Sequence, residues 1–169
     1  MEKLRPARDK WRDIIFCSVV VFVVIADQVT KALIRASLLP GEVFVDFGFF
    51  QIDHIQNTGA SFGILKGYSL LIIVIAVIGV LVIMYLALFM RNRIAFLRNN
   101  WVIVSMAMVT AGTIGNNLID RIRQGHVTDF LDFKIWPAFN VADMCTVVGA
   151  IILAYRLIFY SGLFKSKDD

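Results

Sequence analysis

The chain has 169 residues, of which 59% are hydrophobic and 18% are charged, and its formal net charge is +4. Its mean hydropathy of +0.75 excludes an ordinary soluble domain and indicates a membrane protein. The basic residues form no continuous stripe of the kind that nucleic acid requires, so no nucleic-acid partner is expected.

The first apolar segment predicts a transmembrane helix at about residues 14–36. It begins as an uncharged run, Ile14 to Ala26, and continues through the polar letters D-Q-V-T-K at 27–31. A basic start and a short apolar core are also typical of a secretory signal peptide. No A-x-A-like cleavage site follows, so we interpret the segment as a retained helix. Asp27 and Lys31 lie four apart and can therefore form an ion pair on one helix face.

The next segment, residues 37–67, is rich in β-branched and aromatic residues and contains the turn signal Pro40-Gly41, which predicts short strands. Near its end it contains G-A-S-F-G at 59–63, a formal match to the nucleophile elbow of serine hydrolases, with Ser61 as the candidate nucleophile. The chain lacks the alternating strands and helices that would build the parallel sheet around such an elbow. We therefore interpret these small residues as a close approach of two backbone segments.

Three further apolar segments complete an expected set of four transmembrane helices in a single domain. They lie at about residues 68–90, 99–120 and 137–160, and each is close to the roughly 20 apolar residues that cross a bilayer. The segment 121–136 connects the last two. The fold class expected is an all-α membrane protein with a small extracytoplasmic sheet.

Positive charge orients these helices, because basic residues in short loops and tails tend to stay in the cytoplasm. The basic residues concentrate in both tails and one loop: Lys3, Arg5, Arg8, Lys10, Arg12, Arg91, Arg93, Arg98, Lys165 and Lys167. This distribution predicts that both termini are cytoplasmic and that residues 37–67 and 121–136 are outside.

Polar residues gather at the outer helix ends, where an ionisable group within the membrane needs a partner or a function. These residues are Asp27, Lys31, Asn117, Asp120, Arg121, Asp129, Asn140 and Asp143. Asp143 interrupts an otherwise uncharged span, and the short connection from Asp129 allows the two carboxylates to meet. A pair that shares one proton can activate water and protonate a leaving amine, as in aspartic proteases.

Two other classes of function are compatible with these residues. Intramembrane acids and amides also line ion paths, so a small transporter or proton channel is one alternative. A noncatalytic assembly subunit, in which Asp143 pairs with a basic residue of a partner, is another. The two histidines, His54 and His126, are far apart, and there is no H-E-x-x-H motif or cysteine cluster, so we expect no metal and no cofactor.

Five motifs in order resemble the lipoprotein signal peptidases, the signal peptidase II family of bacteria. They are D-Q-V-T-K at 27–31, N-T-G-A-S-F at 57–62, G-N-N-L-I-D-R at 115–121, G-H-V-T-D-F at 125–130 and F-N-V-A-D at 139–143. Together they cover almost the entire chain.

The resemblance implies a membrane aspartic endopeptidase of the bacterial cytoplasmic membrane. It would cleave the signal peptide from prolipoproteins on the N-terminal side of a diacylglyceryl-modified cysteine, as a monomer in contact with membrane lipids. Asp129 and Asp143 would be catalytic. The supporting residues implied are Asp27, Lys31, Asn57, Asn117, Asp120, Arg121 and Asn140. The outer segments would form a small β-cradle over the site.

This chain departs from the family pattern in the third motif. The family pattern is G-N-x-x-D-R, whereas this chain has Asn116 next to Asn117. Counting back from Asp120 selects Asn117 for the family asparagine, and Asn116 remains the alternative.

Overall fold

The computed structural model describes residues 7–59 and 68–160. It contains long helices and a small sheet, as the sequence predicts. The helices are α1 (Ala7–Ser37), α2 (Ser69–Tyr85), α3 (Asn100–Thr113), α4 (Arg121–Gln124) and α5 (Val141–Tyr160). Two π-helical turns, η2 (Leu86–Met90) and η4 (Ile114–Asp120), extend α2 and α3, and a 3₁₀ turn, η3 (Ala95–Arg98), precedes α3.

Among the described residues, four helical segments are long and apolar enough to cross a membrane, which confirms the expected number. They are Lys10–Ser37, Ser69–Met90, Asn100–Gln124 and Val141–Phe159. A helix is suited to this solvent because it satisfies its backbone hydrogen bonds internally. The last helix begins at Val141, later than the expected 137, because Phe139 instead pairs with Leu131 beside the sheet.

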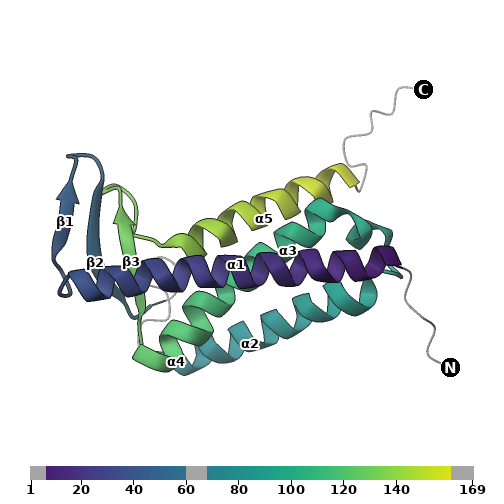
Figure 1. Cartoon of the computed structure of the whole chain (residues 1–169), viewed down its shortest axis with the longest axis horizontal. Coiled ribbons are helices and arrows are strands. Elements are labelled where there is room, and N and C mark those ends of the chain that lie inside the picture. The colour runs from purple at the N-terminus through teal and green to yellow at the C-terminus, as the bar shows by residue number, and fades with distance from the viewer. Residues whose placement is uncertain (1–6, 60–67, 161–169) are drawn as a thin grey trace.

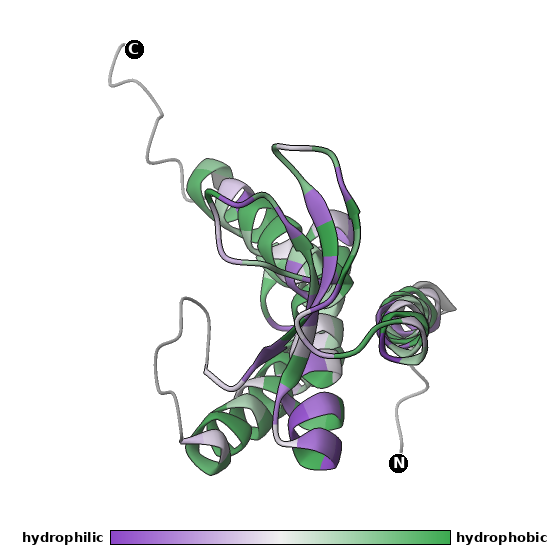
Figure 2. Cartoon of the chain, turned by 90° about the vertical axis from the view of Figure 1, so that its left-hand side faces the viewer, coloured by the Kyte–Doolittle hydropathy of each residue, from purple (hydrophilic) through white to green (hydrophobic). Residues whose placement is uncertain are grey.

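The sheet has three antiparallel strands in the order β1 (Val43–Asp46), β2 (Gln51–Asn57) and β3 (Val127–Asp132). β3 pairs with β2 along its whole length, from Gln51 opposite Asp132 to Asn57 opposite Val127, and this register places Asp129 opposite Ile55. Figure 1 shows the sheet at one end of the helical bundle, while the start of α1 and the end of α5 lie at the other. Figure 2 looks from the sheet end and shows the largely hydrophobic helices behind it.

Close contact between α3 and α5 fixes the start of α5. At Gly112 an added Cβ would collide with the Ala142 carbonyl and the Thr146 side chain, and at Gly149 it would lie 2.8 Å from the Ser105 carbonyl oxygen. Glycine at both positions lets the backbones approach, as is common between membrane helices. The first turn of α5 is thereby held against the end of α3.

The end of the bundle opposite the sheet has its own ion pair and an apolar core. Arg91, fully buried, donates to Asp13 at 2.6 Å. The buried cluster beside it consists of Phe16, Ala87, Leu97, Val102, Ile103, Met106 and Ala107. The hydroxyls of Ser105 and Thr110 bond to carbonyls of their own helix. Within the described residues, this part of the bundle therefore offers no continuous polar path.

Asp53 on β2 is a buried acid outside the helices. The Nε2 of Gln51 donates to one carboxylate oxygen of Asp53 and to one of Asp132, each at 2.9 Å. Burial raises the pKa of Asp53, partly offset by the Gln51 hydrogen bond, and the charge of Asp132 raises it further. The folded state thus binds this proton more tightly than the unfolded chain, so the ionised form destabilises the fold above about pH 4.

Asp53→Asn is therefore expected to raise the melting temperature in detergent at pH 7, with a gain that shrinks as the pH falls toward 4. Asp46→Asn on β1 is the matched control. Hydrogen bonds from Lys134 and Gly48 lower the pKa of Asp46, so its neutralisation is not expected to stabilise the protein at pH 7. An Asp53→Asn protein that melts below the wild type at pH 7 would contradict this reading of Asp53.

Candidate active site

Asp143 is positioned by the N-terminal cap of α5. The Asn140 Oδ1 accepts a hydrogen bond from the Asp143 backbone N–H at 3.0 Å, and the Asp143 Oδ2 accepts one from the Asn140 N–H at 3.3 Å. This reciprocal pair is the geometry of a capping box, formed here by asparagine and aspartate. Asp143 therefore stands in the first turn of α5 with its carboxylate at the helix end.

Asp129 comes from the adjacent strand β3 and is 2% exposed. Its Oδ1 accepts from Asn140 Nδ2 at 2.6 Å, and its Oδ2 accepts from Asn57 Nδ2 at 3.0 Å. Asn140 thus contacts both aspartates, because its side-chain oxygen caps Asp143 while its side-chain nitrogen binds Asp129. Burial, and after it the negative charge of Asp143, raise the pKa of Asp129 to about 7.

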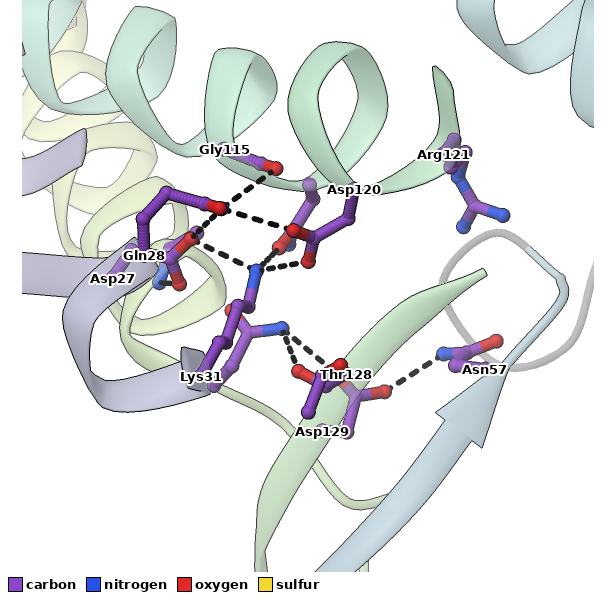
Figure 3. A network of polar contacts seen from close by, with 12 residues as sticks. Asp27, Gln28, Lys31, Asn57, Gly115, Asp120, Arg121, Thr128 and Asp129 are labelled. Atoms are coloured by element: carbon purple, nitrogen blue, oxygen red, sulfur yellow. Dashed lines mark hydrogen bonds and ion pairs between the residues drawn. The ribbon is translucent and has the colours of Figure 1, made fainter. Parts of the chain in front are cut away.

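A buried ion cluster lies behind the two aspartates. Lys31 Nζ is 2.8 Å from Asp27 and 2.7 Å from Asp120, and all three side chains are fully buried. Gln28 Nε2 donates to Asp120 at 2.9 Å and to Asp27 at 3.1 Å. Figure 3 shows Lys31 between the two carboxylates, with Asp129 on the strand beside them. The cluster joins α1 to the end of η4.

Two contacts link this cluster to Asp143 and its helix. Asp27 Oδ1 accepts a hydrogen bond from the Ala142 backbone N–H at 3.0 Å, so a carboxylate from α1 binds the first turn of α5. This is a favourable position for negative charge, because the first backbone N–H groups of a helix lack partners within it. The second contact is Asn116, whose Nδ2 donates to Asp143 Oδ1 at 2.8 Å.

Asn117 faces a different partner from its neighbour. Its Oδ1 accepts from Arg121 Nε at 3.1 Å, and Arg121 Nη2 donates to the Gly59 carbonyl oxygen. The buried Nη1 of Arg121 has no hydrogen-bond partner among the described residues. The Arg121 side chain also lines the adjoining cavity.

Asp129 and Asp143 both line a cavity of about 840 Å³. Its polar wall includes Asn57, Asn117 and Arg121, and its apolar wall comes from α2 and α5: Ile72, Ile75, Ala76, Gly79, Met144, Val147 and Val148. Ligand sites commonly combine a mainly apolar surface with a few polar groups that fix orientation. The cavity suits an elongated apolar chain that presents one polar bond to the carboxylates.

The structure thus brings together the residues that the sequence singled out. They lie around the carboxylate pair, in the ion cluster behind it, or along the cavity wall. Asp129, Asp143, Asn140 and Asn57 form one group, Asp27, Lys31 and Asp120 the second, and Asn117 and Arg121 line the cavity. Sequence reasoning missed Gln28 and the contacts of Asn116. Gln28 could have been found because it is adjacent to Asp27. Asn116 could have been found because it lies four residues before Asp120, on the same helix face. Ser61 lies outside the described residues.

No group of three or more His, Cys, Asp or Glu side chains suited to a metal ion occurs within residues 7–59 and 68–160. The chemistry that this site offers is that of two nearby carboxylates, one of which has a pKa close to neutrality. Such a pair can hold one proton between them, so that one carboxylate is a base while the other is an acid.

The fold and the site define a class, a multi-pass membrane protein with a pair of aspartates at the wall of one cavity. A family model described as signal peptidase (SPase) II matches residues 19–159. The chain belongs to the signal peptidase II family, whose members are aspartic peptidases, and the resemblance seen in the five motifs is confirmed.

Individual relatives agree with this assignment over most of the chain. A lipoprotein signal peptidase of Caldanaerobacter subterraneus subsp. tengcongensis is 45% identical over 147 residues, 86% of this chain and 97% of the relative. One from Dehalococcoides mccartyi strain 195 is 41% identical over 147 residues, 86% of this chain and 91% of the relative. A solved structure described as a bacterial membrane enzyme at 2.3 Å resolution is 31% identical, with a TM-score of 0.79 over 91% of this chain and 92% of its own.

Proposed function

We propose that Asp129 and Asp143 are the catalytic pair with which this protease cleaves the signal peptide from prolipoproteins, on the N-terminal side of a diacylglyceryl-modified cysteine. The observation that carries the proposal is the shared contact of both carboxylates with Asn140, at the wall of one cavity. Family membership supplies the reaction class, peptide hydrolysis of lipoprotein precursors by an aspartic peptidase.

The proposed reaction uses one protonated and one ionised carboxylate. The ionised carboxylate takes a proton from water while the water oxygen attacks the scissile carbonyl carbon, and the protonated one gives its proton to the carbonyl oxygen. The tetrahedral intermediate then collapses. Its C–N bond breaks as the nitrogen receives the proton taken from water, and the proton on the oxygen returns to the other carboxylate.

The remaining cavity residues have supporting roles in this proposal. Arg121 and Asn117 hold the substrate backbone, since both polar side chains line the cavity and are hydrogen-bonded to each other. Asn57 and Asn140 keep Asp129 aligned. The apolar faces of α2 and α5 accept the hydrophobic signal peptide and acyl chains, and Asp27, Lys31 and Asp120 fix the helices that carry the pair.

The proposed orientation places the sheet and the active site outside the cytoplasmic membrane and both termini inside it. Basic residues near the opposite end of the bundle support this, including Arg91, Arg93 and Arg98. Exposed Phe44 on β1, with Phe47 and Phe49 in the turn between β1 and β2, offers apolar contact to the surrounding lipid. The protein is proposed to act as a monomer.

The test of the reaction is a cleavage assay with the purified full chain in lipid-detergent micelles. The substrate is a prolipoprotein segment with or without diacylglycerol on its cysteine, and products are weighed by mass spectrometry. The expected result is one cut before the modified cysteine, with the unmodified peptide left intact and no effect of a metal chelator. Absence of cleavage of the lipid-modified peptide, or a cut elsewhere, would contradict the proposal and favour the transport or assembly alternatives.

Cleavage is also expected to decline as the pH rises through about 7. The pKa of Asp129 is about 7, so below that pH Asp129 keeps the proton that it donates, and above it the proton is lost. Asn57 donates to Asp129 and favours its ionised form. Asn57→Ala should therefore move the alkaline limb of the kcat/KM profile to higher pH, while Gln56→Ala, an exposed position on the same strand, should leave it in place. A limb that stays fixed or moves to lower pH in Asn57→Ala would argue against Asp129 as the acid.

A further inference from the structure

Asn116 is a buried amide, 6% exposed, with both of its polar atoms committed to protein partners. Its Oδ1 accepts from Lys31 Nζ at 2.5 Å and its Nδ2 donates to Asp143 Oδ1 at 2.8 Å. An ammonium has only donors, so it binds the amide oxygen and leaves the amide nitrogen for the opposite side. Lys31 therefore fixes Asn116 as a donor toward Asp143.

The π-helical turn η4 makes this arrangement possible. The Arg121 backbone N–H binds the Asn116 carbonyl, five residues earlier, which widens the helix at this point. Asn116 contacts Lys31 and Asp143, whereas the next residue, Asn117, contacts Arg121. Single π turns within helices are frequent at functional sites, where they redirect side chains. Here both asparagines have a partner in the site.

Among the described residues, the Asp143 carboxylate accepts two hydrogen bonds, and the one from the Asn116 side chain is the shorter. The other, from the Asn140 backbone N–H, is 3.3 Å long. An amide whose oxygen is bound to a cation is polarised and becomes a better donor, especially in a buried site. Lys31 cannot move easily, because Asp27 and Asp120 hold it on two further sides.

We infer that Asn116 is a positioning residue that holds the Asp143 carboxylate toward the cavity and couples it to the buried Lys31. This inference rests on the proposed catalytic role of Asp143. Because neither polar atom of the Asn116 side chain is free for substrate, its loss should slow turnover without weakening substrate binding.

The experiment compares Asn116→Leu and Asn116→Asp with the wild type in the prolipoprotein cleavage assay. Leucine is close to asparagine in size and removes both hydrogen bonds. Aspartate keeps an acceptor for Lys31 but cannot donate to Asp143 when ionised. Both are expected to lower kcat by about 10- to 100-fold, because small displacements of a catalytic group have effects of this size, with KM within twofold of the wild-type value.

Thr110→Val is the matched control, since it removes a buried hydroxyl from α3 that, among the described residues, bonds only to its own helix. It should keep kcat within twofold. Melting temperature and size-exclusion profile identify the folded variants, and Asn116→Leu, which adds no charge, decides the outcome if Asn116→Asp does not fold. An unchanged kcat, or a raised KM with kcat unchanged, in folded Asn116→Leu would overturn the inference.

Asp143→Asn in the same assay separates this inference from the proposed function. If Asp143→Asn is inactive while Asn116→Leu turns over normally, only the role of Asn116 is wrong. If Asp143→Asn remains active, the proposed catalytic pair is wrong, and the inference about Asn116 is overturned with it.

Discussion

Replacing Lys31 with methionine is expected to lower the free energy of unfolding by about 3–5 kcal/mol, the range for removing one partner of a buried ion pair. Methionine is similar in length, so the change is mainly one of charge. Lys31 neutralises two carboxylates, Asp27 and Asp120, at 2.8 and 2.7 Å, and all three side chains are at 0% exposure. Without the ammonium, two negative charges remain buried with no counter-charge between α1 and η4.

The measurement is thermal unfolding in detergent micelles, in which Lys31→Met should melt about 10 °C or more below the wild type. Thr30→Val on the same helix is the control, because within the part of the chain that the structure describes its hydroxyl bonds only to carbonyls of α1. The double variant Lys31→Met with Asp120→Asn removes one of the stranded charges and should recover part of the loss. A Lys31→Met protein that melts within 2 °C of the wild type would contradict a structural role for this cluster.

Substituting asparagine for Asp129 or Asp143 is expected to lower kcat by about 10³-fold or more, since each removes a proton donor or acceptor from the reacting bond. Asparagine is isosteric with aspartate, so the cavity should survive in both proteins. Its single amide oxygen can keep the hydrogen bond from Asn140, while the one from Asn57 or Asn116 is lost. The two aspartates act as one unit in the proposed mechanism. The double variant should therefore be about as slow as either single one, as is usual for groups that function together.

Asp132→Asn is the matched control for these variants. It is the same substitution on the same strand, β3, but Asp132 contacts Gln51 and does not line the cavity. Its kcat should stay within about twofold of the wild type. If Asp132→Asn loses as much activity as Asp129→Asn, the loss reflects a disturbed sheet and not the removal of a catalytic carboxylate.

Local spacing was sufficient to predict several of these contacts. Asp27 and Lys31 are one helical turn apart and form the expected ion pair. Asn140 and Asp143 are three apart at the start of a helix and form the reciprocal cap. In each case the geometry depends only on helical periodicity, which the sequence displays directly.

Only some of the contacts between distant segments could be predicted from the sequence. The short connection between Asp129 and Asp143 predicted that the two would be near one another, and hydrophobic length predicted the four spans. Arg91 and Asp13, 78 positions apart, carry no comparable signal, and neither does the contact of Gln28 with Asp120, 92 positions away. Such pairs depend on how the helices are placed beside one another, which hydropathy does not specify.

The π turn explains why counting residues within the motif could not decide between Asn116 and Asn117 for the position of the family asparagine. Motif spacing assigns one residue per position of a regular helix, and it selected Asn117. In η4 the hydrogen bond from Arg121 reaches back five residues to Asn116, so the helix is locally wider. Asn116 then faces Lys31 and Asp143 while Asn117 faces Arg121. Irregular turns of this kind are not marked by hydrophobic periodicity.

The most direct measurement is the single-turnover rate of cleavage of a diacylglyceryl-modified prolipoprotein by four folded proteins: the wild type, Asp129→Asn, Asp143→Asn and Ser61→Ala. If the two aspartates carry out the hydrolysis, both asparagine variants lose at least about 10³-fold in rate and Ser61→Ala cleaves at close to the wild-type rate. Loss of cleavage in Ser61→Ala, with activity retained in both asparagine variants, would contradict the aspartate pair and identify Ser61 as the nucleophile.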